Sequence, residues 1–168
     1  MEEADSKSSQ DRILENKKSI RDTEMSTDSL YTFDDNNSEA AKNQQGENTS
    51  VGVFNGKGYR HGEKNIGWFS YDLKIDPTAE KNYLNCTYYS GDNGRTFDVY
   101  VNGQKLKTVT INTAAGTNMF YVDTTEIPAE YLTEGSDTIT VKFQAIPGKN
   151  SYVGGLFGIS TSSSTAYD

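Results

Sequence analysis

The sequence is poor in the side chains that most often carry chemistry. It has one cysteine, Cys86, and one histidine, His61, in 168 residues. A single thiol can form neither an internal disulfide nor a four-cysteine zinc site. Nowhere do 18 apolar residues follow one another, and the start MEEADSKSS lacks a basic segment followed by an apolar run. We therefore expect neither a transmembrane helix nor a signal peptide, and the localisation stays open.

Basic residues are scarce relative to acidic ones. The chain has 16 Lys and Arg against 24 Asp and Glu, which gives a formal net charge of -8. An acidic surface repels phosphate groups, so nucleic acid and anionic membranes are not expected as partners. Neutral or cationic ligands fit this charge better.

Apolar residues are few and unevenly distributed. They make up 33% of the chain, and the only aromatic residues before position 51 are Tyr31 and Phe33. A segment with so little apolar content contributes little to a core, and the length favours one domain. The expected organisation is a flexible tail (1–27), a linker or extended wrap (28–50), the folded domain (51–162) and a second flexible tail (163–168).

From residue 51 onward, apolar and polar residues alternate in short runs. In FSYDLKI (69–75) and TITVKFQA (138–145) every second residue is apolar, which is typical of strands with one buried face. In TFDVYVNGQKL (96–106) the alternation reaches Asn102-Gly103, the strongest short signal for a β-hairpin. About eight such runs predict an all-β fold: an antiparallel β-sandwich, jelly-roll or galactose-binding-like, with an irregular N-terminal arm.

No pair of acidic residues stands out as catalytic. Hydrolysis of a glycosidic bond needs two carboxyl groups roughly 5–9 Å apart, one of them with a raised pKa. The acidic residues of the folded part mostly occupy outward strand positions or turns, where they are solvated. These residues are Asp72, Glu80, Asp92, Asp98, Asp123, Glu126 and Glu130. We therefore expect no catalytic residue in this chain.

Cys86 is open to two interpretations, a nucleophile or a buried core residue. A nucleophilic thiol needs a nearby histidine, metal or helix N-terminus to lower its pKa, and His61 lies in a glycine-rich loop without a recognisable partner. Strand alternation places Cys86 on one face with Leu84 and Tyr88. That apolar company favours a buried, unreactive thiol.

The loop SGDNGR (90–95) offers Asp92 and Asn93, whose oxygen atoms suit calcium. The longer pattern of a calcium loop is missing, so a plain turn between two strands is the better interpretation, and no metal or other cofactor is expected. Calcium remains the alternative.

Carbohydrate binding has the best chemical support. Sugar rings lie with their C–H faces on flat aromatic side chains, while their hydroxyls pair with planar polar groups. Trp68 and Tyr89 stand at strand ends with outward parity, and Arg60, Asp92 and Arg95 lie in the adjoining loops. We predict that these five residues contact a glycan. A tryptophan that closes one end of the core is the alternative for Trp68.

Several segments, in this order, resemble one known domain type: SEAAKNQQGENTSVG (38–52), GYRHGEKNIGWFSYDLKID (58–76), NYLNCTYYSGDNGRTFDVYVNGQKL (82–106), FYVDTTEIPAEYL (120–132), TITVKFQA (138–145) and GGLFGI (154–159). Together they resemble the C-terminal β-sandwich of β-L-arabinofuranosidase-type glycoside hydrolases, which are family 127-like. The resemblance covers residues 27–160. The family's connecting segment carries a histidine after its Ser-Glu pair, whereas Ala40 and Ala41 stand there in this chain, so no role of that histidine is transferred.

The resemblance implies an accessory role. In that family the chemistry belongs to a large (α/α) barrel N-terminal to the sandwich, with a zinc-bound cysteine cluster and glutamates that this chain lacks. The expected function is weak, non-catalytic glycan binding in the context of bacterial polysaccharide degradation. The alternatives are a docking domain that supports a catalytic glycosidase domain without binding sugar, and a glycoside hydrolase in its own right. The expected partners are a neutral glycan or a catalytic glycosidase domain.

Overall fold

The computed structural model describes residues 26–33, 35–113 and 116–164. These residues form twelve strands, one short α-helix and two 3₁₀ helices. The strands pair antiparallel throughout and form three sheets. The predicted antiparallel β-sandwich is therefore confirmed.

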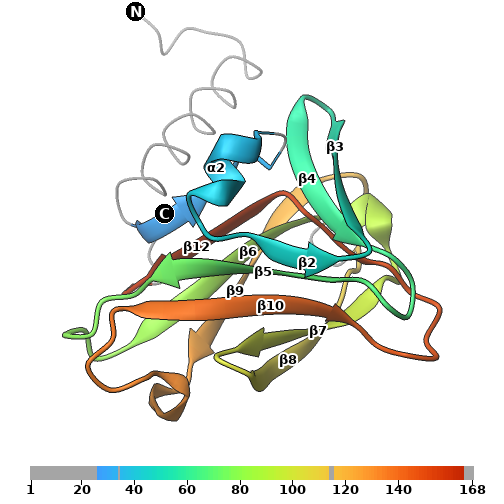
Figure 1. Cartoon of the computed structure of the whole chain (residues 1–168). Helices are drawn as coiled ribbons and strands as arrows, with labels where there is room; N and C mark the ends of the chain where they lie inside the picture. Colours follow the sequence, from blue (N-terminus) through green and yellow to red (C-terminus); the bar gives the residue numbers. More distant parts are fainter. Residues whose placement is uncertain (1–25, 34, 114–115, 165–168) are drawn as a thin grey trace, which may run out of the picture.

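Two of the sheets face each other (Figure 1). The four-stranded sheet contains, in spatial order, β1 (Ser26–Leu30), β12 (Gly158–Ser162), β6 (Asn82–Tyr89) and β9 (Phe120–Ile127). The five-stranded sheet contains β2 (Gln45–Glu47), β5 (Trp68–Lys74), β10 (Thr138–Ala145), β7 (Thr96–Val101) and β8 (Gln104–Thr110). The third, three-stranded sheet rises from one end of the sandwich and contains β11 (Val153–Leu156), β4 (Lys57–Gly62) and β3 (Thr49–Phe54).

The strand alternation seen in the sequence determines the core. Phe69, Tyr71 and Leu73 of β5 are fully buried, as are the alternating apolar residues of β7 and β10. Tyr88 of β6 packs edge-on against Phe97 of β7 with ring centroids 5.7 Å apart, so side chains of the two large sheets meet in one core. Sheets that bury one face in this way keep the other face polar.

The predicted hairpin at Asn102-Gly103 is confirmed. Asn102 and Gly103 both have positive φ, 50° and 84°, and join β7 to β8 as a tight hairpin. The segment between β9 and β10 contains the 3₁₀ helix η3 (Ala129–Tyr131), and Gly135 after it has a φ of 79°.

Residues 28–50, for which the sequence predicts a linker or an extended wrap, run along both large sheets. Strand β1 pairs with β12 and strand β2 pairs with β5, so both lie inside sheets. Phe33 is fully buried, and the α-helix α2 (Asn36–Ala40) begins with a side-chain cap from Asp35. This segment has few apolar residues, so its composition does not indicate a part of the core. Its strands are held by backbone hydrogen bonds to β12 and β5, and Leu30 and Phe33 are its residues in the hydrophobic core. The folded unit therefore starts earlier than residue 51.

The two predicted tails lie almost wholly outside the described residues, apart from the start of β1 and residues 163–164. Within the described part of the chain, no helix combines the length and apolar composition that crossing a bilayer requires.

Candidate functional site

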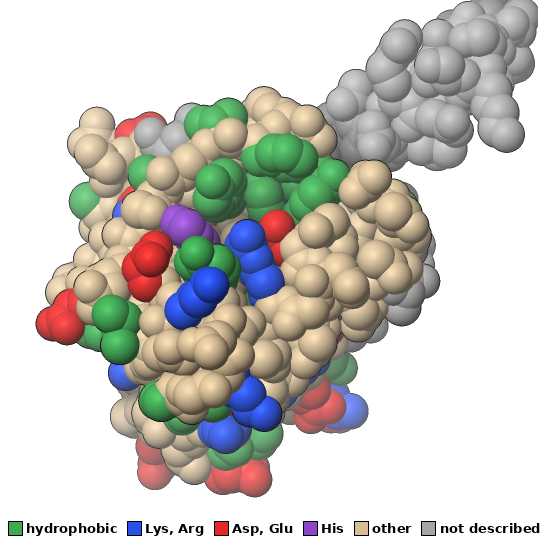
Figure 2. All heavy atoms as spheres, turned by 90° about the vertical axis from the view of Figure 1, so that its right-hand side faces the viewer, with side chains coloured by type: hydrophobic (Ala, Val, Ile, Leu, Met, Phe, Trp, Pro, Cys, Tyr) green, Lys and Arg blue, Asp and Glu red, His purple; other side chains and the backbone are tan. Residues whose placement is uncertain are grey.

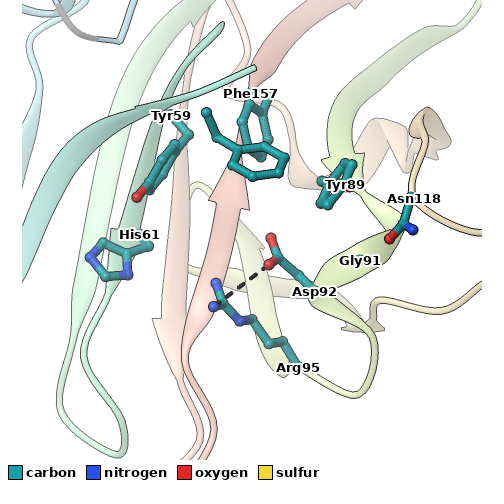
Figure 3. Close-up of a pocket in the computed structure, with 9 residues that line it drawn as sticks. Tyr59, His61, Tyr89, Gly91, Asp92, Arg95, Asn118 and Phe157 are labelled. Carbon is teal, nitrogen blue, oxygen red and sulfur yellow. Dashed lines mark ion pairs between the residues drawn. The ribbon is translucent and has the colours of Figure 1, made fainter. Parts of the chain in front are cut away.

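A pocket of about 430 Å³ opens at the end of the sandwich that carries the three-stranded sheet. On this face of the molecule, hydrophobic side chains gather beside the single histidine, with basic and acidic side chains next to them (Figure 2). The β3–β4 hairpin, the end of β6 with the following turn, the loop before β9 and the residue that precedes β12 form its walls. The lining residues are Phe54, Tyr59, His61, Tyr89, Gly91, Asp92, Arg95, Asn118 and Phe157 (Figure 3).

The β3–β4 hairpin supplies one wall. Asn55 and Gly56 have positive φ, 52° and 74°, and form the tight turn at its tip. Because alternate residues of a strand point to opposite faces, Tyr59 and His61 of β4 both face the pocket. Tyr59 pairs with Gly52 of β3, where a Cβ atom would lie 2.6 Å from the tyrosine hydroxyl. The missing side chain at Gly52 thus leaves room for the Tyr59 ring.

A chain of aromatic rings lines the apolar side of the pocket. Phe54 contacts Tyr89 with ring centroids 4.8 Å apart, and Tyr89 contacts Phe120 at 5.1 Å. Phe157 continues the chain, 4.9 Å from Phe120 and 5.2 Å from Tyr59. Phe54 and Tyr59 belong to the three-stranded sheet, Tyr89 and Phe120 belong to the four-stranded sheet, and Phe157 lies between β11 and β12. Their mutual contacts fix the orientation of each ring.

Asp92 and Arg95 form the polar side. Both belong to the turn that joins β6 to β7, which begins with the 3₁₀ helix η2 (Ser90–Asp92). Asp92 Oδ2 accepts a hydrogen bond of 3.3 Å from the Gly155 amide, and Arg95 Nη1 donates one of 3.1 Å to the Gly154 carbonyl. Asp92 Oδ1 lies 3.6 Å from Arg95 Nη2 (dashed in Figure 3). The glycine backbone thus holds both side chains, while a carboxylate oxygen and a guanidinium nitrogen remain side by side.

His61 lies at the border between the apolar and polar sides. Its Nε2 lies 2.8 Å from Ser50 Oγ, and its ring stacks on Tyr152 with centroids 5.9 Å apart. The Arg95 guanidinium group packs over the same Tyr152 ring, 5.1 Å from its centroid. Burial, followed by the positive charge of Arg95, lowers the pKa of His61, so the imidazole is neutral at neutral pH.

Three of the five predicted glycan contacts come together in this pocket: Tyr89, Asp92 and Arg95. Arg60 lies elsewhere, because its side chain leaves β4 on the face opposite Tyr59 and His61. It is 8% exposed and forms a two-pronged ion pair with Glu39 of helix α2, with bonds of 2.7 and 2.8 Å. The structure therefore assigns Arg60 an internal partner in place of the predicted ligand contact.

Trp68 also lies outside the pocket. It stands at the start of β5 on the outer face of the five-stranded sheet, as its outward parity predicted, and pairs with Gln144 of β10. The Lys142 ammonium group lies 4.7 Å from the centroid of its ring. Neither Trp68 nor Arg60 contributes to the group formed by Tyr89, Asp92 and Arg95.

Sequence reasoning missed several lining residues. The glycines around His61 indicate a loop in the sequence, whereas Tyr59 and His61 both belong to strand β4. Phe157 lies in the short break between β11 and β12. The alternation of residues 57–62 was the one available signal. The contacts between sheets carry no signal in a single sequence.

Cys86 is a core residue, as strand alternation indicated. It is 3% exposed beside Leu84 and Tyr88. Burial raises its pKa to about 12, so the thiol stays protonated and unreactive in the folded protein.

The described residues do not fit a calcium ion in the pocket. Calcium takes six to eight oxygen ligands, whereas Asp92 is the single carboxylate among the nine lining residues and it lies against a guanidinium group. In the described ranges, no three His, Cys, Asp or Glu residues cluster in a way that could hold a metal ion.

A family model described as "Family of unknown function (DUF6805)" matches residues 23–160. The chain belongs to the DUF6805 family. The match begins before β1 and includes residues 28–50, so the family unit contains the segment that composition suggested was a linker. No curated protein matches the chain.

Solved structures similar to this DUF6805 domain include carbohydrate-binding modules. A family 35 module from Clostridium thermocellum is 15% identical, with a TM-score of 0.52, over 79% of this chain and 95% of that module. A CBM36 module, solved in complex with calcium and xylotriose, is 13% identical, with a TM-score of 0.51, over 74% of this chain and 96% of that one. At these identities the similarity shows a shared fold.

An enzyme also contains this fold. The exo-β-1,3-galactanase from Phanerochaete chrysosporium, solved with β-1,3-galactotriose, is 16% identical, with a TM-score of 0.51. The match covers 73% of this chain but 28% of that enzyme, so the shared fold is one part of a longer polypeptide there. The resemblance to the accessory domain of β-L-arabinofuranosidase-type hydrolases is not tested by these matches and stays a prediction.

Proposed function

We propose that this domain is a non-catalytic module that binds a neutral glycan in the pocket at the β3–β4 end. The observation that carries the proposal is the facing arrangement of the aromatic chain and the Asp92–Arg95 pair across a cavity of about 430 Å³. A sugar ring has the matching faces, because its C–H groups pack on aromatic rings and its hydroxyls pair with planar polar groups.

The polar pair suits two neighbouring hydroxyl groups. Asp92 Oδ1 can accept a hydrogen bond from a ligand and Arg95 Nη2 can donate one to it. The two atoms lie 3.6 Å apart. Adjacent hydroxyls of one sugar ring can each donate and accept, so one can bond to the carboxylate while the other accepts from the guanidinium. Tyr59 and Phe157 then contact the apolar face of the same ring.

Chemistry on the glycan is not part of the proposal. Hydrolysis requires a second carboxyl group at a suitable distance from the first, and the pocket residues include Asp92 alone. The shared fold with modules solved as independent carbohydrate-binding domains supports the same conclusion.

Attachment to a catalytic domain is the natural context for such a module. The sequence resemblance to the accessory sandwich of β-L-arabinofuranosidase-type hydrolases and the galactanase match both favour it. In this context the domain would bring a glycan to a catalytic glycosidase domain of the same polypeptide. A longer reading frame that encodes an upstream (α/α) barrel would support this; a frame without any glycosidase domain would count against it.

The test is calorimetric titration of the domain with arabino-, xylo- and galacto-oligosaccharides. Binding by the wild type and its loss in Tyr89→Ala would support the pocket, while Trp68→Ala serves as the matched control because its ring lies on the outer sheet face. Trp68 is the one tryptophan of the chain, so binding in the pocket should leave its fluorescence unchanged. No heat with any of the sugars would overturn the proposal, and loss of binding in Trp68→Ala alone would move the site to the outer face.

A further inference from the structure

Strand β4 presents different residues to two different parts of the molecule. Tyr59 and His61 face the pocket, whereas Arg60 between them points to the opposite side of the hairpin, toward helix α2. Any movement of Arg60 along or away from the sheet therefore moves two pocket residues that are bonded to it directly.

Arg60 has a dense set of partners on that side. Its Nε and Nη2 donate to the two carboxylate oxygens of Glu39 at 2.7 and 2.8 Å, and its Nη1 donates to Thr49 Oγ1 at 3.0 Å. The Tyr71 hydroxyl, on the five-stranded sheet, donates to Glu39 Oε2 at 2.5 Å. Glu39 is 2% exposed. The carboxylate thus joins helix α2, the hairpin and the large sheet at one buried point.

The hairpin has few other polar attachments. In the part of the chain that the structure describes, every side-chain hydrogen bond from β3 or β4 to another element comes from Arg60. The rest of the hairpin is held by its pairing with β11, by continuity with β2, and by ring contacts such as Phe54 on Tyr89. A buried ion pair with two parallel bonds fixes orientation more strictly than apolar contacts do.

We propose that Glu39 is a positioning residue for the pocket. Glu39 binds Arg60 on the face of β4 opposite the pocket. This contact fixes the position of the β3–β4 hairpin relative to the rest of the sandwich, so that Phe54, Tyr59 and His61 line the cavity. Helix α2, which has no residue in the pocket, thereby becomes part of the binding site's framework. That a glycan is the ligand rests on the proposed function, whereas the coupling between Glu39 and the hairpin does not.

The test compares two substitutions in the same N-terminal segment. Glu39→Gln keeps the side-chain shape but removes the charge that pairs with Arg60. Asp28→Asn is the matched control, because it removes the charge that pairs with Lys42 and leaves a weaker acceptor for the Lys74 amide, and neither contact involves the hairpin. Amide hydrogen exchange is measured without ligand, at a temperature at which both variants are folded.

We expect exchange in residues 49–62 to rise by about tenfold or more in Glu39→Gln relative to the wild type, with β5 and β10 unchanged. Asp28→Asn should leave the exchange of the hairpin as it is. Equal exchange of the hairpin in the two variants, or a rise in all strands together, would overturn the proposal.

Two further measurements keep the proposal open to refutation. If Glu39→Gln does not fold, the double variant Glu39→Leu, Arg60→Met removes both charges, and it should fold and show the same selective rise in hairpin exchange. If the wild type binds an oligosaccharide, Glu39→Gln should weaken the affinity by about tenfold while Asp28→Asn does not. Absence of binding by the wild type would refute the proposed function and leave the exchange result to decide the role of Glu39.

Discussion

Gly91 provides the sharpest available perturbation of the pocket. A Cβ atom built at this position would lie 2.2 Å from Cε2 and 2.9 Å from Cδ2 of Tyr89. Such distances are far inside van der Waals contact, so Gly91→Ala must push the Tyr89 ring away. Gly91→Ala adds one methyl group and keeps the Tyr89 side chain. It therefore tests whether binding depends on the position of the ring, whereas Tyr89→Ala tests whether binding depends on the ring at all.

The magnitude follows from the contacts that the ring would lose. Tyr89 packs on Phe54 at 4.8 Å and on Phe120 at 5.1 Å, and aromatic pairs contribute roughly 0.5–1.5 kcal/mol each. Loss of both pairs would lower the free energy of unfolding by about 1–3 kcal/mol, which most domains tolerate because their total is roughly 5–15 kcal/mol. The variant should fold, with the aromatic wall of its pocket displaced.

Urea denaturation and calorimetric titration of the same samples test this reasoning. Gly91→Ala should lower the unfolding free energy within the stated range and weaken glycan binding as strongly as Tyr89→Ala does. If Gly91→Ala binds with wild-type affinity while Tyr89→Ala does not bind, the Tyr89 ring can move without loss of glycan affinity. That result would refute the claim that binding depends on the fixed position of this ring.

Three more predictions follow from the same geometry. Asp92→Asn should weaken glycan binding by about tenfold or more in calorimetry, because hydrogen bonds to a charged acceptor are worth roughly 1.5–3 kcal/mol; unchanged affinity would exclude the carboxylate as a contact. Because burial and Arg95 lower the pKa of folded His61, the unfolded chain binds the proton more readily. The contribution of neutral His61 to the free energy of unfolding should be complete above pH about 6.5 and should decline as the pH falls toward the folded pKa. Equal pH profiles of urea denaturation for the wild type and His61→Gln would contradict this. Cys86, whose pKa burial raises to about 12, should resist thiol reagents at pH 8 and react fully in urea, and rapid labelling of the folded protein would contradict its burial.

The sequence was most informative where one side of a strand is buried. In residues 69–75 and 138–145, alternation identified both the strands and the inward side chains, because period 2 is a property of each strand alone. Asn102-Gly103 was equally clear, since its turn depends on the φ preference of two adjacent residues.

The sequence was least informative where structure depends on distant partners. Strand β2 is fully exposed and exists because β5 offers a free edge, so nothing in its own residues marks it as a strand. Arg60 illustrates the same point for the site. Its position in the chain suggested a ligand contact, and its actual partner, Glu39, lies 21 residues earlier. Only Tyr89, Asp92 and Arg95, which lie within one turn, could be grouped correctly from local sequence.

The pairing of β1 with β12 has a consequence for how such a domain can be combined with others. Ser26 pairs with Ser162, at the end of β12 that is farthest from Phe157 and the pocket. Polypeptide that continues beyond either strand therefore departs from a common corner, about 16 Å from the pocket end at 3.3 Å per residue. The chain thus enters β1 and leaves β12 away from the pocket mouth, which neither strand end approaches.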